Sequence, residues 1–203
     1  MSAAEDRALP NARMRHVLLA VQDIMGRNGL TAVLKSSELD RFVGTLPPEN
    51  DALEIRATEL GRLIAAIETQ YGRGARGQLT RIGYSAFQHL LSADRFGWGV
   101  LKLFLHVSPI GERRRAALTR LARYISAPNS GVRVKIEEGQ LLFEDSLSDE
   151  GAGRGNVSED SSLSIGILQA CIEWATGEAL DVVQVKHKAR GDSTSRFEIG
   201  DPR

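Results

Sequence analysis

The stretch VKHKARGDSTSRFEI, residues 185–199, predicts a β-hairpin that closes a sheet. Side chains alternate between the two faces of a strand, so the odd-numbered residues from Val183 to Ala189 are expected on the inner face. The odd-numbered residues from Ser195 to Ile199 share the apolar side of the returning strand. With the turn centred near residue 191, His187 and Ser195 would sit opposite each other, which places an imidazole toward the interior.

A second hairpin is predicted upstream of the first. Apolar and charged residues alternate over 132–137, and Glu138-Gly139 is a two-residue turn signal before the apolar residues of 141–143. Between the two hairpins, Ser162–Thr176 predicts a helix that ends at Gly177, a residue suited to the left-handed position after a helix. Four antiparallel strands are therefore expected.

The first 126 residues instead carry helical periodicity. Helices are predicted over 12–25, 51–71, 78–92 and 112–126, with shorter ones near 30–34 and 37–43. Asp51 is the expected N-terminal cap of the second helix. Gly83 lies inside a predicted helix, where glycine costs about 1 kcal/mol against alanine, which indicates a close contact with another helix. The predicted fold is α+β, with helices packed on one face of a four-stranded antiparallel sheet.

Length and composition suit one soluble domain. The chain has 203 residues and 22.2 kDa, and we expect a flexible tail over residues 1–10 and a single domain over 11–203. Lys plus Arg equals Asp plus Glu at 26 each, so overall charge does not favour nucleic acid as a partner. The single cysteine, Cys171, fits a reducing cytoplasm. No apolar run approaches the roughly 20 residues that span a bilayer, so a cytoplasmic location without a membrane span is expected.

The last hairpin also resembles a known family. Its pattern x-x-Ala-x-Gly-Asp-x-x-x-x-Phe-x-Ile, the segments 71–76 and 81–83, and the glycine-bounded segment 166–177 are similar to the 4-vinyl-reductase domain family. That family of bacterial and archaeal ligand-binding domains is similar in fold to the small subunits of the TRAPP tethering complex, so the resemblance implies the same α+β architecture. Many members carry cysteines where this chain has His187 and Ser195, and a zinc site is therefore not expected here.

The resemblance further implies a hydrophobic pocket between the helices and the sheet. Residues 96–105 hold more apolar side chains than one helix stripe can use, which is consistent either with such a pocket or with an ordinary core. The expected ligand-binding residues are Phe87, Phe96, Trp98, Leu101 and Phe104, with His187 as a polar anchor.

A glycine-rich segment, residues 72–77, matches G-x-G-x-x-G. A helix rather than a strand is predicted before it, which argues against a dinucleotide site. Arg73 and Arg76 could still hold a carboxylate or phosphate of a ligand beside a helix N-terminus, and the alternative is a helix corner with solvated arginines.

We therefore expect a small-molecule-binding domain, a carrier or sensor. The family resemblance suggests a tetrapyrrole or another apolar, lipid-like ligand, and no further cofactor is predicted. No nucleophile with its base can be placed in the sequence. Two alternatives stay open: a 4-vinyl reductase of bacteriochlorophyll synthesis or its accessory subunit, which the resemblance implies, and a protein-interaction scaffold. The apolar helix Ala12–Met25 predicts a homodimer.

Overall fold

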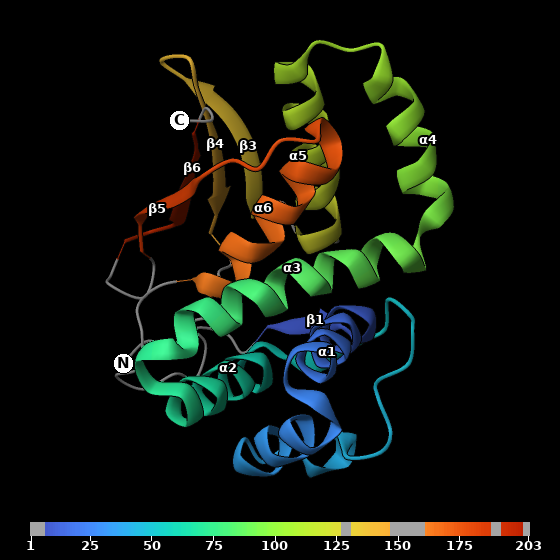
Figure 1. Ribbon diagram of the computed structural model, residues 1–203, viewed down its shortest axis with the longest axis vertical. Helices are drawn as coiled ribbons and strands as arrows, with labels where there is room; N and C mark the ends of the chain where they lie inside the picture. The colour runs from blue at the N-terminus through green and yellow to red at the C-terminus, as the bar shows by residue number, and fades with distance from the viewer. Residues whose placement is uncertain (1–6, 127–130, 147–160, 188–191, 201–203) are drawn as a thin grey trace.

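The computed structural model describes residues 7–126, 131–146, 161–187 and 192–200. The N-terminal half contains β1 (Ala8–Pro10), α1 (Asn11–Ser36), the 3-10 turn η1 (Asp40–Phe42), β2 (Leu53–Arg56), α2 (Ala57–Tyr71), the 3-10 turn η2 (Gly72–Gly74) and α3 (Ala75–Ala93). The C-terminal half contains α4 (Arg95–His106), α5 (Ile110–Ser126), β3 (Val132–Glu137), β4 (Gln140–Asp145), α6 (Ser162–Thr176), β5 (Val182–Lys186) and β6 (Ser195–Ile199). Figure 1 shows α3 running between these two halves.

The first helix changes direction at Gly26, where φ is 72° and ψ is 171°. This confirms the predicted break after residue 25, because a left-handed residue suits glycine and interrupts the helix. The apolar face of the first segment, including Met14, Val17 and Leu18, is buried in the N-terminal core of the same chain. The apolar character that suggested a homodimer is thus explained by packing within the chain.

The prediction of a helix from residue 51 is wrong at its N-terminal end. Leu53–Arg56 is strand β2, which pairs antiparallel with β1, and Leu9 and Ile55 are opposite each other and fully buried. Strand pairing buries both side chains, so it prevails over the helical pattern. The helix starts at Ala57, and Glu59 Oε2 accepts the Arg56 N–H at 2.8 Å. Part of the expected flexible tail, residues 8–10, is therefore paired.

The predicted four-stranded sheet is confirmed. Its order is β3-β4-β6-β5 and every neighbouring pair is antiparallel. At the first hairpin, Glu138 and Gly139 both have positive φ, 51° and 81°, as a two-residue turn of the primed type requires. In Figure 1 α5 and α6 lie against one side of the sheet, and α4 lies farther out.

The inner face predicted for β5 is shifted by one residue. Val182 is buried and pairs with Ile199, whereas Val183 and Val185 are exposed. A bulge between Gln184 and Lys186 changes the alternation, and bulges cannot be read from a period-two pattern. Strand pairing ends at Lys186, one residue before His187, whose backbone N–H donates to the Asp192 carboxylate at 2.8 Å.

Helix α3 crosses α6 at two facing glycines. A Cβ on Gly83 would lie 2.1 Å from the carbonyl oxygen of Leu163, and one on Gly166 would lie 2.0 Å from that of Thr80. These distances leave no room for a side chain, which confirms the close helix contact predicted at Gly83. The backbones of α3 and α6 can therefore approach each other closely.

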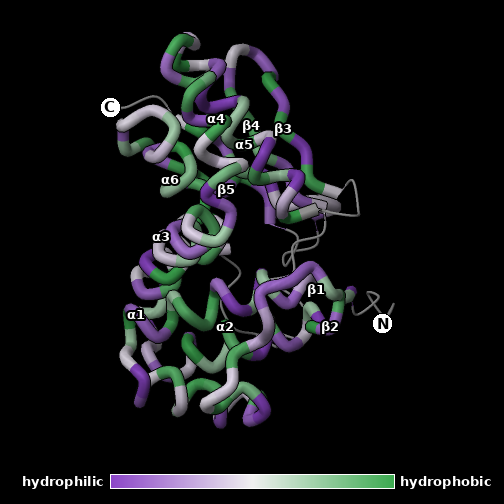
Figure 2. Tube along the Cα trace, turned by 90° about the vertical axis from the view of Figure 1, so that its right-hand side faces the viewer, coloured by the Kyte–Doolittle hydropathy of each residue, from purple (hydrophilic) through white to green (hydrophobic). Residues whose placement is uncertain are grey.

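Two hydrophobic cores result. One is formed by α1, α2, β2 and the first part of α3, and the other by the end of α3, α4, α5, α6 and the sheet. Figure 2 shows the same division from the side, with α1, α2, β1 and β2 on one side of α3 and the sheet on the other. In the described ranges, no helix is both long and apolar enough to cross a bilayer.

Candidate functional site

A cleft of about 660 Å³ lies where the two halves meet. It is formed by β1 and the start of α1, the segment 49–53, the end of α3, the start of α4, and α5. Its lining residues are Pro10, Ala12, His16, Glu49, Asp51, Leu53, Leu90, Ala93, Asp94, Trp98, Arg120, Arg123 and Tyr124. The floor is buried and apolar apart from His16, and the rim is exposed and charged.

The polar centre of the cleft is His16. Its Nδ1 lies 2.9 Å from Tyr124 Oη, and its Nε2 lies 2.8 Å from Glu49 Oε1. The second contact is poorly aligned, so Nε2 has no hydrogen-bond partner among the described residues despite being buried. Burial lowers the pKa of His16 and outweighs the opposite effect of Glu49, which keeps the imidazole neutral at neutral pH.

Tyr124 fixes the position of this imidazole. The two rings stack at 24° with their centroids 6.2 Å apart. Burial strongly raises the pKa of Tyr124, so its hydroxyl keeps its proton and serves as a hydrogen-bonding group rather than as a nucleophile.

Two arginines of α5 form one side of the cleft. Arg120 pairs with Asp94 and lies over the Trp98 ring, 5.1 Å from its centroid. Its Nε is buried and has no hydrogen-bond partner in the described part of the chain. Arg123 is exposed on the rim, almost one turn farther along the helix. Guanidinium groups in this position can bind carboxylates of a ligand.

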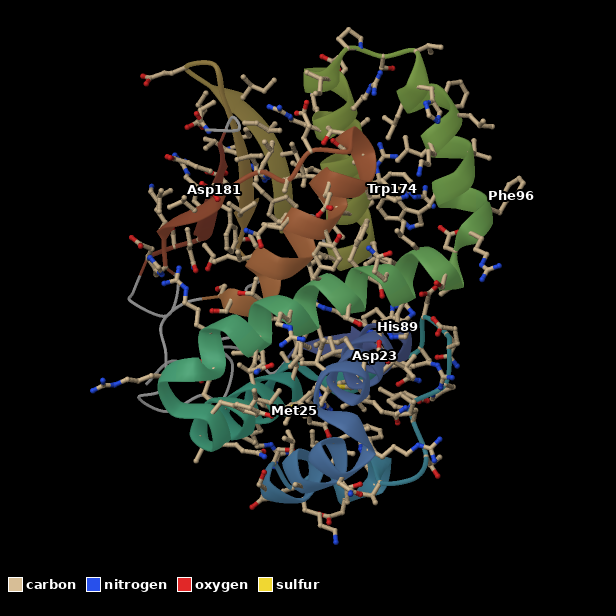
Figure 3. The ribbon with its side chains drawn as sticks, viewed as in Figure 1. Asp23, Met25, His89, Phe96, Trp174 and Asp181 are labelled. Atoms are coloured by element: carbon tan, nitrogen blue, oxygen red, sulfur yellow. The ribbon has the colours of Figure 1, made fainter. Side chains whose placement is uncertain are left out.

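The apolar wall of the cleft is Trp98. Its ring makes edge-to-face contacts with Phe87, at 5.4 Å between centroids, and with Trp174, at 5.2 Å. Figure 3 shows Trp174 between α6 and α4. Asp94 caps α4 by accepting the Gly97 N–H at 3.0 Å, so the same carboxylate positions Trp98 and Arg120.

The structure brings together only part of the pocket predicted from the sequence. Phe87 and Trp98 are in contact, and Leu101 packs partly buried against the same core. Phe96 and Phe104 are 85% and 67% exposed. They lie on the opposite side of the helix from Trp98, because successive helix residues are about 100° apart, and Phe96 points away from the molecule in Figure 3.

The other predicted ligand contacts lie outside the cleft. Arg73 and Arg76 are exposed at the far end of α3, about 25 Å from Ala93 by helix rise. His187 follows β5 and does not line the cleft. The expected space between helices and sheet, bounded by Phe87 and Phe143, measures about 30 Å³, which suits a single water.

Sequence reasoning missed His16, Glu49 and Tyr124. They come from separate elements and share no motif spacing. The available signal was an imidazole within the apolar pattern of residues 12–25. His89 does not compete for this role, because its Nε2 lies 2.7 Å from the Asp23 carboxylate, between α3 and α1 (Figure 3). In the described ranges no cluster of three metal-ligating side chains is present.

Solved structures of similar fold are H-NOX (heme nitric oxide/oxygen-binding) domains. An H-NOX protein from S. oneidensis in the Fe(II)NO ligation state has a TM-score of 0.58 and 10% identity over 92% of this chain and 97% of that one. A structure from work on heme distortion in the H-NOX family has a TM-score of 0.59 and 12% identity, over 94% of this chain and 93% of that one. An oxygen-binding H-NOX domain related to soluble guanylate cyclases has a TM-score of 0.53 and 12% identity, over 91% of this chain and 89% of that one.

The fold is therefore H-NOX-like. No protein-family model and no curated protein matches the chain. The resemblance to the 4-vinyl-reductase family and TRAPP subunits is wrong, and with it the link to bacteriochlorophyll synthesis. The glycines that contributed to it have local structural roles in this chain, at the α3–α6 crossing and at the left-handed residue after α6.

Proposed function

We propose that this chain is a sensor domain that binds heme in the cleft beside His16. The observation that carries the proposal is a buried imidazole whose Nε2 makes no well-aligned hydrogen bond among the described residues and faces only the exposed Glu49 carboxylate, in a cleft of an H-NOX-like fold. Heme proteins commonly bind iron through a histidine nitrogen.

The surroundings of His16 fit this role. Metal-bound histidines usually have their other ring nitrogen held by a hydrogen bond that fixes the tautomer, and Tyr124 is in that position at Nδ1. Glu49 covers Nε2 from an exposed position, so its carboxylate can turn toward solvent when a ligand enters.

The rest of the cleft suits a flat molecule with an apolar body and acidic edges. Its volume of about 660 Å³ lies within the range of ligand pockets, which is about 300–1,000 Å³. Trp98 and Leu90 supply apolar surface, and Arg120 and Arg123, which line the same cleft, would hold the two propionates. When bound, heme supplies an iron centre that can take up a small gas such as nitric oxide or oxygen.

The same contacts offer a route for a signal. His16 belongs to α1 and Tyr124 to α5, and α5 packs on β3. A displacement of the imidazole would therefore move α5 relative to α1 and reach the sheet.

Titration of the purified full chain with ferric heme tests the proposal. We expect saturable one-to-one binding with a shifted Soret band, and weaker binding of the iron-free protoporphyrin. Arg123→Ala should weaken binding because a propionate contact is lost, whereas Arg73→Ala, a matched change at an exposed arginine away from the cleft, should not. Absence of saturable binding would contradict the proposal.

A further inference from the structure

Helix α4 carries an unusual exposed surface. Four apolar side chains along it face solvent, and the stripe continues past the end of the helix. These residues are Phe96, Val100, Leu103 and Phe104, followed by Val107 and Ile110. Leu103 and Val107 are 72% and 87% exposed, so this is a continuous apolar face rather than scattered single residues.

The face is a regular consequence of helix geometry. Positions 96, 100, 103 and 107 recur every three or four residues and so form one stripe. Trp98 and Leu105, the two buried residues of α4, lie on the opposite side and attach the helix to the core. Helix α4 is also the outermost element in that part of the molecule (Figure 1). The stripe is therefore presented outward on a protruding helix.

The charges within α4 have one sign. Helix α4 contains Arg95, Lys102 and His106 and no acidic residue. By helix position these three lie together on one flank of the stripe. Asp94, the acidic residue just before α4, is engaged by Arg120 and the Gly97 N–H.

A hollow of about 230 Å³ adjoins this basic flank. It is lined by Lys102, Leu105, His106, Arg113, Trp174, Ala175, Thr176 and Gly177, a set without a carboxylate. Arg113 donates to the carbonyl oxygens of Ser108 and His106, which fixes its guanidinium beside the end of α4. The hollow can therefore accept a phosphate group next to the apolar stripe.

We propose that α4 docks the protein on the surface of an anionic lipid bilayer. The apolar stripe would enter the boundary between headgroups and acyl chains, while Lys102, His106 and Arg113 contact lipid phosphates. A helix with bulky apolar residues on one face and basic residues beside it is typical of binding at this interface. Charge complementarity favours an anionic lipid surface over a second copy of the chain as the partner of α4, because pairing two α4 helices would bring like charges together.

Co-sedimentation of the full chain with vesicles tests this proposal. We expect binding to vesicles of phosphatidylcholine with phosphatidylglycerol, weakened by salt, and little binding to phosphatidylcholine alone. The double variant Phe96→Ser/Phe104→Ser should lower the affinity at least about tenfold. A matched variant, Val183→Ser/Val185→Ser, removes exposed apolar residues of β5 and should bind like the wild type.

Three outcomes of the vesicle assay would overturn the proposal: no binding to the anionic vesicles, equal binding by the two double variants, or equal binding to both vesicle types. A concentration-dependent dimer that is lost in Phe96→Ser/Phe104→Ser would also overturn it and assign the face to a second copy. Circular dichroism of each variant confirms that a loss of binding is not a loss of fold.

Discussion

Tyr124 Oη lies 2.9 Å from His16 Nδ1, and this contact joins two helices whose residues are 108 positions apart in the chain. His16 is buried at the edge of the N-terminal core, and Tyr124 packs against the C-terminal core. The hydrogen bond therefore couples the two halves of the molecule at the floor of the cleft. It also gives the imidazole a fixed orientation.

Replacing Tyr124 by phenylalanine should reduce both stability and heme binding. The ring volume is kept, but Nδ1 of a buried imidazole loses its partner, which should lower the free energy of unfolding by about 1–3 kcal/mol. If His16 binds heme iron as proposed, heme affinity should fall by about 10- to 100-fold, the loss typical when the hydrogen-bond partner of a metal-bound histidine is removed. Urea denaturation and heme titration measure the two effects, and an unchanged affinity would show that Tyr124 does not orient a ligand.

A side chain at the α3–α6 crossing should be strongly destabilising. Gly83→Ala and Gly166→Ala each place a Cβ within about 2.1 Å of a backbone carbonyl oxygen, so the helices must separate. We expect a loss of at least about 2 kcal/mol in unfolding free energy for each. Gly99→Ala in α4 is the matched control: nothing lies within 4 Å, and it should stabilise the protein by about 0.5–1 kcal/mol. Equal effects at Gly83 and Gly99 would contradict the observed crossing.

The sheet contains an ion-pair network that should respond to acid. Glu144 accepts from Lys135 at 2.6 Å and Arg196 at 2.5 Å, and these cations, Lys135 first, hold the pKa of the Glu144 carboxyl below its ordinary value despite partial burial. A lowered folded-state pKa contributes stability that is present above the unfolded pKa, about 4.3, and is lost as pH falls through the folded value.

Glu144→Gln should accordingly lower the unfolding free energy by about 1–3 kcal/mol at pH 7. The difference from the wild type should shrink as the pH is lowered below about 4, since the wild-type carboxylate then also loses its charge. Denaturant titrations at several pH values measure this. A constant difference across that range would mean that the charge of Glu144 does not matter.

Alanine substitutions of Trp98 and Phe96 should differ sharply in their effect on stability, although the two residues are only two positions apart in the sequence. Trp98→Ala removes a buried ring from contact with Phe87 and Trp174 and should cost about 3–5 kcal/mol. Phe96→Ala alters an exposed side chain and should stay within about 0.5 kcal/mol. Similar losses for both, in thermal or urea unfolding, would show that α4 is rotated from the orientation described.

Local signals in the sequence predicted much of the fold. The helix Ser162–Thr176 ends at Gly177, as predicted, because one left-handed residue with φ of 79° terminates it. The Glu138-Gly139 turn was equally readable, since two adjacent residues determine it. The inner face of β5 could not be predicted in the same way, because a bulge between Gln184 and Lys186 shifts the alternation of side chains by one residue.

The cleft could not be predicted from the sequence for a different reason. Tertiary packing brings together His16, Glu49 and Tyr124, and their spacing in the sequence matches no motif that would predict this contact. The segment 96–105 was misread because its apolar residues serve two faces of α4. One holds the helix through Trp98 and the other is exposed at Phe96 and Phe104. Composition alone does not separate a core face from an exposed one.

The most direct test of the account compares the absorption spectra of ferric-heme-loaded wild type, His16→Ala and His187→Ala. If His16 binds the iron, His16→Ala should shift the Soret band and lower heme affinity at least about tenfold, and added imidazole should restore the wild-type spectrum. His187→Ala, which removes the anchor expected from the sequence, should match the wild type. A His16→Ala spectrum and affinity identical to those of the wild type would contradict the account.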